Sequence, residues 1–297
     1  MRSSPLLHNL FLAAYLVAAT ICTSAGVLEE SDSLHPEPTS PGVGIARKGL
    51  SLAKLQEAIR LNPKSAQAYL ERGDALLSDS ETEKAMLDFN KVLELNPRCG
   101  KAYIGKFFCL ADGQHMDQAL AALKKAIELG PADVSMDALY LQASVHKDQG
   151  KFQTALEEFT RVIKSNLFSK RRLARVYVQR GMVHDRMNAK PASISDYTNA
   201  IKLNPDFGKA YLFRANAYSD MGDFKHADEN YSVVEKNIEN VSSADRKPDF
   251  ELVKADLYRF RAEYYKRIKR PDLARINNKK RLREERDDVD ISPFRGN

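Results

Sequence analysis

A proline that closes an apolar helical segment recurs along this chain at a fixed interval, and no other feature restricts the fold as strongly. The segment before Pro63 reappears before Pro97 and before Pro131, each 34 residues after the last, and again before Pro205. A fixed period of this length is typical of proteins built from stacked structural repeats. Unrelated helices have no reason to keep a common register, so the interval predicts a repeat architecture over most of the chain.

Each period contains two amphipathic segments joined by a turn. Between residues 66 and 99, apolar side chains fall three or four positions apart, first around Leu76 and then around Phe89. Such spacing gives each helix one apolar stripe. Gly73 and Ala85 are small where the two helices must approach closely, and the proline ends the second helix. The sequence therefore predicts one antiparallel helix pair in each period.

This pattern resembles the tetratricopeptide repeat. That family places a small residue at repeat position 8, alanine at 20 and 27, an aromatic residue at 24 and proline at 32. The matching residues between 46 and 241 are Gly73, Ala85, Phe89, Pro97, Ala119, Ala126, Pro131, Ala155, Phe159, Gly181, Tyr197, Ala200, Pro205, Ala215, Gly222, Ala227 and Tyr231. The resemblance implies an all-α fold, a right-handed superhelical solenoid of stacked antiparallel helix pairs.

Departures from the repeat define the expected domain plan. The solenoid, 46–241, begins with a half repeat and continues with five repeats, and extra residues after Pro131 and at Lys170–Leu173 predict longer first helices or loops. Residues 242–290 keep the small-residue spacing but lose the aromatic position. They predict a degenerate capping repeat with a basic C-terminal helix, followed by a tail, 291–297.

The first 25 residues have the three parts of a cleavable signal peptide. Arg2 precedes the apolar stretch Leu10–Cys22, and small residues follow up to Ala25. We expect cleavage there and export to a periplasm, the extracellular space or the endoplasmic-reticulum lumen. An uncleaved anchor and a lipid on Cys22 are the alternatives, but a membrane span needs ~20 residues. Residues 26–45, rich in proline, serine and glycine, predict a flexible spacer.

Catalytic and metal-binding patterns are absent from the sequence. It contains no Gly-x-Ser-x-Gly elbow, His-Glu-x-x-His site or Cys-x-x-Cys pair. Gly100–Phe107 resembles a phosphate-binding loop, but it lacks the final hydroxyl residue and lies within a repeat helix. His146 and His184 fill a position usually taken by tyrosine; the alternative is a metal shared with Asp148 or Asp185. We therefore expect no enzyme activity, no cofactor and no metal.

The first helices are expected to line a binding groove. In the family, positions 2, 5, 6, 9, 12 and 13 point into the concave wall, and here that row is largely apolar with scattered charges. An exposed apolar channel with a polar rim is typical of a peptide-binding site, unless neighbouring helices or the spacer cover it. The candidate groove residues are Leu70, Asp74, Lys101, Ile104, Phe108, Tyr140, Leu141, Val178, Met182, Lys209, Leu212, Phe213 and Asn216.

Charge gives weaker information about partners. The net charge of +6 does not indicate nucleic-acid binding unless it concentrates on one face. Basic residues do concentrate between 266 and 286, but carboxylates interleave with them, which favours a solvated capping helix over binding to acidic lipid or nucleic acid. We expect a protein or peptide partner, no nucleic acid, and membrane contact only through an uncleaved targeting segment.

These features predict an exported adaptor or scaffold that binds a partner segment in its apolar groove. Residues of the groove do not match the subset of the family that grips the C-terminal carboxylate of chaperones, since only Lys209 fits that arrangement. The alternative hypothesis is a structural assembly component of an envelope or lumenal complex, which would use its convex surface or its terminal helices.

Overall fold

The computed structural model describes residues 51–111, 114–239 and 254–290. Helices account for most of these residues, and no strand occurs among them. The described chain forms two compact units, the first ending at Glu158 and the second beginning at Phe159. None of the described helices combines the length and apolar character needed to cross a membrane. The predicted signal peptide, spacer and tail lie outside the described residues.

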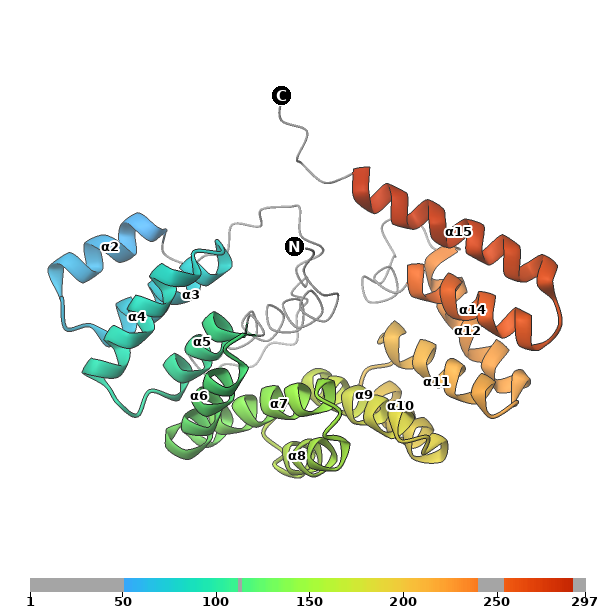
Figure 1. Cartoon of the computed structure of the whole chain (residues 1–297), viewed down its shortest axis with the longest axis horizontal. Coiled ribbons are helices and arrows are strands. Elements are labelled where there is room, and N and C mark those ends of the chain that lie inside the picture. Colours follow the sequence, from blue (N-terminus) through green and yellow to red (C-terminus); the bar gives the residue numbers. More distant parts are fainter. Residues whose placement is uncertain (1–50, 112–113, 240–253, 291–297) are drawn as a thin grey trace. The chain divides into compact units, whose positions relative to one another are not determined.

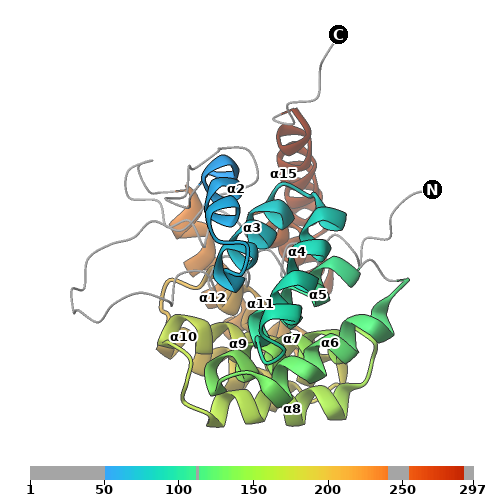
Figure 2. The same ribbon diagram turned by 90° about the vertical axis from the view of Figure 1, so that its left-hand side faces the viewer.

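The first unit consists of helix pairs that follow the predicted repeats (Figure 1). Its helices are α2 (Leu52–Leu61), α3 (Ala66–Ser78), α4 (Thr82–Leu95), α5 (Gly100–Leu110), α6 (Met116–Leu129), α7 (Ala132–Asp148) and the first half of α8 (Phe152–Lys164). Within each repeat α3 packs on α4 and α5 on α6, and the first helices also contact one another, α3 with α5 and α5 with α7. Figure 2 shows the lone helix α2 beside α3, which it contacts.

The second unit continues the same arrangement after the middle of α8. Its helices are α9 (Lys170–Arg186), α10 (Lys190–Leu203), α11 (Gly208–Asp220), α12 (Phe224–Glu239), α14 (Lys254–Arg267) and α15 (Pro271–Asp290). The pairs are α9 with α10, α11 with α12 and α14 with α15, and the first helix α11 contacts both α9 and α14. The predicted all-α fold of stacked antiparallel helix pairs is therefore confirmed within each unit.

Glycine and aromatic residues set the distance between paired helices. A Cβ atom on Gly73 would lie 2.8 Å from the ring of Phe89, and one on Gly181 would lie 2.7 Å from the ring of Tyr197. Both aromatic side chains are fully buried. The close approach expected at Gly73 is confirmed, because a larger residue there would displace the ring that fills the repeat.

The turns between α3 and α4, α7 and α8, α9 and α10, α11 and α12, and α14 and α15 share one backbone conformation. Ser80, Gly150, Asn188, Gly222 and Lys269 all have φ between 58° and 78°. This left-handed region strains residues that carry a Cβ, and glycine and asparagine tolerate it best. The repeat therefore fixes the turn even where the sequence supplies serine or lysine.

The extra residues within the repeats extend first helices. Helices α7 and α9 each have 17 residues, whereas α3 and α11 have 13. Pro191 lies in the first turn of α10, where its missing N–H has no helical partner to lose. Neither the extra residues nor Pro191 interrupts a helix of its repeat.

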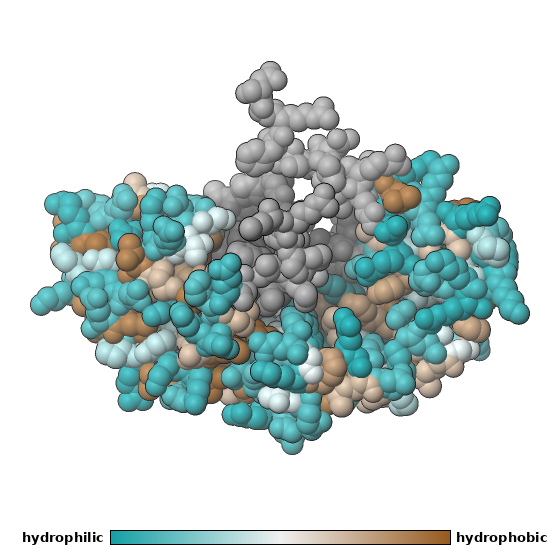
Figure 3. Space-filling view, viewed as in Figure 1, coloured by the Kyte–Doolittle hydropathy of each residue, from teal (hydrophilic) through white to brown (hydrophobic). Residues whose placement is uncertain are grey.

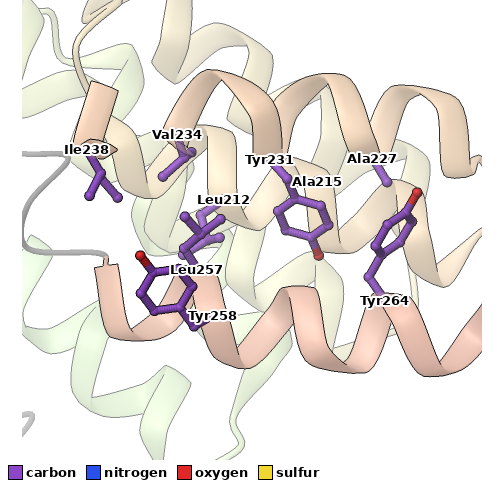
Figure 4. Close-up of a cluster of buried hydrophobic side chains, with 9 residues drawn as sticks. All are labelled: Leu212, Ala215, Ala227, Tyr231, Val234, Ile238, Leu257, Tyr258 and Tyr264. Carbon is purple, nitrogen blue, oxygen red and sulfur yellow. The ribbon is translucent and has the colours of Figure 1, made fainter. Parts of the chain in front are cut away.

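The final helix pair closes the second unit by burying aromatic side chains against α11 and α12 (Figure 4). The rings of Tyr231 from α12 and Tyr264 from α14 lie 5.5 Å apart. The buried side chains of this cluster are Leu212, Ala215, Ala227, Tyr231, Val234, Ile238, Leu257, Tyr258 and Tyr264. Burial of this apolar surface is what holds α14 on the preceding repeat.

Candidate functional site

A buried polar pair joins the two helices of several repeats. Arg72 donates hydrogen bonds of 2.8 and 2.7 Å to both carboxylate oxygens of Asp88, and Arg180 donates bonds of 2.9 and 2.6 Å to Asp196. Each arginine lies sixteen residues before its partner. Planar guanidinium and carboxylate groups match in two parallel bonds. These pairs serve the helix packing and are unavailable to a ligand.

The sequence interpretation missed these pairs, although the signal was present. In the next repeat Arg214 donates to Asn230 at 3.0 Å over the same interval. Aligning the repeats would have shown an arginine and a carboxylate or amide sixteen residues apart. Such a recurrence across two helices indicates a contact inside each repeat.

The two histidines considered as metal ligands instead contact an acidic residue of their own repeat. His146 Nδ1 lies 2.8 Å from Glu158 Oε2, and His184 Nε2 lies 3.8 Å from Asp196 Oδ2. Burial lowers the pKa of His184, because its charged form loses hydration. Among the described residues, no group of three or more histidine, cysteine, aspartate or glutamate side chains is placed to hold a metal.

The segment that resembles a phosphate loop belongs to helix α5. A Cβ on Gly105 would lie 2.4 Å from the ring of Phe89, and one on Gly100 would lie 2.8 Å from Gly130 Cα. The glycines of this segment therefore allow α5 to approach its neighbours. Their spacing reflects packing and not a nucleotide site.

In the first unit, the candidate groove residues divide into buried and accessible side chains. Asp74, Lys101 and Phe108 are half-buried and reach the surface. The others, which lie inside, are Leu70, Ile104, Tyr140 and Leu141. The predicted exposed apolar row is therefore corrected here: its aliphatic members pack between helices, and Phe108 is the accessible apolar residue among them.

In the second unit, two candidates are buried and four are accessible. Val178 and Leu212 are 2% and 0% exposed, and both belong to hydrophobic clusters between helices. The sequence prediction placed them on the surface because helical spacing marks a stripe but not its edge. Lys209 is exposed, and the half-buried candidates are Met182, Phe213 and Asn216.

Phe213 is the centre of the accessible part of this face. Its ring lies 5.8 Å from that of Tyr197 and 6.1 Å from that of Phe260. Phe260, on α14, is also half-buried, and the guanidinium of Arg259 lies 4.8 Å from the centre of its ring. The sequence interpretation missed Phe260, since it treated that helix only as a cap. An aromatic side chain held by two rings presents a fixed apolar surface.

Asn216 lies one helical turn beyond Phe213 on α11. Its side chain is half-buried and makes no hydrogen bond to another described residue. A carboxamide offers one acceptor and two donor hydrogens, so it can pair with both the C=O and the N–H of a peptide group. We define the second-unit face as Met182, Lys209, Phe213, Asn216 and Phe260, contributed by α9, α11 and α14.

A cluster of opposite charges joins three helices on another part of the second unit. Asp220 accepts a hydrogen bond from Lys190 at 2.5 Å and another from Arg267. Partial burial raises the pKa of Asp220, but these two hydrogen bonds outweigh it and leave the pKa below its usual value. Lys190 Nζ also lies 3.3 Å from Asp185 Oδ1, so two carboxylates offset the two cations. The cluster joins successive repeats of the second unit.

The surface outside these clusters is polar. Figure 3 shows hydrophilic side chains over most of the visible face of the described residues, with small hydrophobic areas between them. Among the large apolar side chains that are exposed, Leu61 and Leu87 belong to the first unit and Ile276 and Leu282 to α15. The other exposed large apolar side chains of the second unit are Leu167, Met187, Met221 and Phe224.

Comparison with known families matches tetratricopeptide-repeat models to both units. One model matches residues 47–102 and 110–166, and a second matches residues 174–207 and 208–232. The matched residues begin in the half repeat and end within α12.

Curated relatives match a short part of the chain. The mouse DnaJ homolog subfamily C member 7 is 33% identical over 86 residues, which cover 29% of this chain and 17% of that protein. A 58 kDa phosphoprotein of Plasmodium berghei is 35% identical over 80 residues, covering 26% of this chain and 18% of its own length. The aligned stretch is thus less than a fifth of either relative.

Solved structures share the fold at low sequence identity. The hetero-tetramer Cut9-Hcn1 of the APC/C superimposes with a TM-score of 0.61 at 19% identity, over 83% of this chain and 44% of that one. Pseudomonas aeruginosa pilF gives a TM-score of 0.58 at 16% identity, over 75% of this chain and 90% of that one. These likenesses concern the arrangement of helices alone.

Proposed function

Because the chain belongs to the tetratricopeptide-repeat family and is a protein-interaction scaffold, we propose that it is an exported adaptor that holds a partner segment on its second-unit face. The observation that carries the proposal is the accessible Phe213, fixed between the rings of Tyr197 and Phe260. Next to it lies Asn216, whose amide bonds no described residue.

The chemistry of this face favours a short segment with an apolar side chain. Met182, Phe213 and Phe260 provide an apolar surface, and burial of one large side chain against it contributes about 1.5 to 3 kcal/mol. The amide of Asn216 bonds the backbone of the segment, which fixes its direction. Lys209 at the rim adds a positive charge that favours a nearby carboxylate on the partner.

Loss of the partner from a surface variant tests the site. The full chain and its Phe213→Glu variant are crosslinked in the native host and recovered with bound proteins. A Leu87→Glu variant is the matched control, because Leu87 is 68% exposed on α4 in the first unit. All three proteins must show the same helical circular dichroism. We expect one partner with the parent and the control and none with Phe213→Glu.

One outcome of this experiment counts against the second-unit face. Recovery of the same partner by all three proteins would move the site to the convex surface or the terminal helices, as the assembly-component alternative requires. A second variant, Asn216→Ala, separates binding from stability, since it removes no bond within the described protein. It should weaken recovery and leave the melting temperature unchanged.

Export is the second part of the proposal and rests on the first 25 residues. Their charge, apolar core and small residues at Thr23, Ser24 and Ala25 support a cleaved signal peptide. Intact-mass measurement of the protein purified from its host is the test. A chain that begins at Gly26 agrees with export, whereas a chain that retains Met1–Ala25 contradicts cleavage.

A further inference from the structure

Helix α15 carries three exposed basic side chains in one row. Arg275, Lys279 and Arg283 are exposed, and none forms an ion pair with another described side chain. They follow one another at four-residue intervals. They therefore lie along one side of the helix over roughly 12 Å.

Several cations on other helices of the repeats form ion pairs with a neighbouring carboxylate. On earlier second helices, Lys91 lies 2.7 Å from Glu94 and Lys125 lies 3.5 Å from Glu128. On α14, Lys266 lies 2.6 Å from Glu263. The sequence interpretation assigned the whole basic region to a solvated cap because carboxylates interleave with it. The structure separates a paired group on α14 from the basic stripe of α15, which we define as Arg275, Lys279 and Arg283.

Two aliphatic side chains flank the basic stripe. Ile276 is 51% exposed and Leu282 is 48% exposed, on opposite sides of the line of cations. A helix with basic residues and flanking apolar side chains lies in the interface of an anionic bilayer, with the cations at the headgroups and the apolar groups below them. The helix packs chiefly against α14, which leaves this side open.

We propose that the basic stripe of α15 docks the protein on a membrane surface rich in anionic phospholipid. The stripe lies on the outward side of a single helix, so it fits a flat partner better than an extended peptide, which needs a groove. Its exposed positions include no aromatic side chain to stack on bases, which disfavours single-stranded nucleic acid. This contact is independent of the second-unit face.

A single introduced tryptophan reports the contact locally, because the chain contains none. The full chain with Ile276→Trp is mixed with vesicles of phosphatidylcholine alone or with an equal part of phosphatidylglycerol. The control is Leu87→Trp, on an exposed site of the first unit. We expect a blue shift of the emission only for Ile276→Trp and only with the anionic vesicles, reduced by added salt.

Removing the charges tests the basic stripe itself. Each cation near an anionic surface contributes roughly fivefold to partitioning. The variant Arg275→Gln, Lys279→Gln, Arg283→Gln in the Ile276→Trp background should therefore partition roughly 100-fold more weakly. A matched control replaces three exposed lysines of other second helices, Lys124, Lys164 and Lys202, with glutamine and should bind as the parent does.

Several results would overturn the proposal. They are a missing shift at Ile276→Trp, an equal shift with neutral vesicles, and an unchanged shift after removal of the three charges. A shift with poly-glutamate but not with vesicles would also overturn it and assign the basic stripe to an acidic protein. Circular dichroism of each variant confirms that the helices are intact.

Discussion

The two compact units are built from the same repeat, but they join successive repeats by different chemistry. In the first unit, α5 reaches the preceding repeat through Gly105, where a Cβ would lie 2.4 Å from the ring of Phe89. In the second unit, hydrogen bonds cross between repeats: Arg180 donates to Thr160 at 3.0 Å, and Arg214 donates to Thr198 at 3.1 Å. The joint between α4 and α5 thus depends on shape, and at the joint between α6 and α7 the hydroxyl of Ser135 donates to the carbonyl of Ile127 at 3.0 Å. The joints of the second unit use charged guanidinium donors.

This difference shows that the period fixes backbone geometry and leaves the side-chain chemistry of the joint free. The arginine–aspartate pair within a repeat varies too. In the repeat of α5 and α6, Lys106 and Ala122 stand where Arg72 and Asp88 stand one period earlier, so this repeat lacks that ion pair. It relies on close packing instead. The stability of a repeat protein is approximately the sum of the stabilities of its repeats and of the interfaces between neighbouring repeats. Each interface can therefore be weakened separately and its chemistry tested.

The largest effect should follow from removing the acid of a buried pair in the second unit. Asp196→Ala leaves the partly buried Arg180 without its bidentate partner. We expect a loss of about 3 to 5 kcal/mol in the free energy of unfolding. Urea unfolding measures it. Asp196→Asn keeps one hydrogen bond and should cost clearly less. Equal costs would show that packing, not charge, governs the contact between α9 and α10.

A smaller loss should follow from filling the tight joint of the first unit. Gly105→Ala drives a methyl group into the ring of Phe89, which is fully buried. We expect a net cost of about 1 to 3 kcal/mol. The double variant Gly105→Ala, Phe89→Leu sharpens the test. Its cost should fall short of the sum of the two single costs; simple additivity would contradict a steric joint.

Relief of a strained turn should stabilise the protein. Ser80 has φ of 61° in the turn after α3. Ser80→Gly removes a strain of about 1 kcal/mol, partly offset by the greater freedom of glycine in the unfolded chain. We expect a small rise in the melting temperature. Gly150→Ala is the reverse change at the same repeat position, where φ is 76°, and it should lower that temperature.

The smallest effect should be a pH dependence of the charged joint at Asp220. Its hydrogen bonds with Lys190 and Arg267 hold its pKa below the usual value. A carboxyl group with a depressed folded-state pKa stabilises the protein above its unfolded pKa, and this stability is lost as pH falls through the folded pKa. Because the group is partly exposed, we expect less than about 1 kcal/mol.

Unfolding of the parent and of Asp220→Asn between neutral and acid pH measures this contribution. The difference in unfolding free energy between the two proteins should shrink as the pH falls below the usual carboxyl range. A difference that stays constant would show that the joint does not depend on the charge of Asp220.

Sequence alone predicted the fold because the repeat pattern consists of residues that lie close together in the chain. Gly73, Phe89 and Pro97 keep their places in the period, and the helix boundaries follow from them. The extra residues after Pro131 were expected to lengthen either a first helix or a loop, and they lengthen the first helix α7. Helical period and helix-ending residues are local properties, so a single sequence carries them.

The candidate site was predicted less well because burial depends on neighbours. Leu212 and Phe213 are adjacent in sequence and both fit the inner positions of the family, yet Leu212 is buried and Phe213 reaches the surface. Phe260 joins the site from a helix whose degenerate sequence concealed its role. Which residue on a stripe stays accessible is decided by the helices packed on either side, and the period does not encode that.

Site-specific photocrosslinking from the second-unit face tests whether a partner binds there. A photoreactive amino acid is placed at Asn216 in the full chain expressed in its own host, and at Leu87 as the control position. If the partner lies on the second-unit face, position 216 forms a covalent adduct with one protein and position 87 forms none. An adduct from position 87 with none from position 216 would contradict binding at that face.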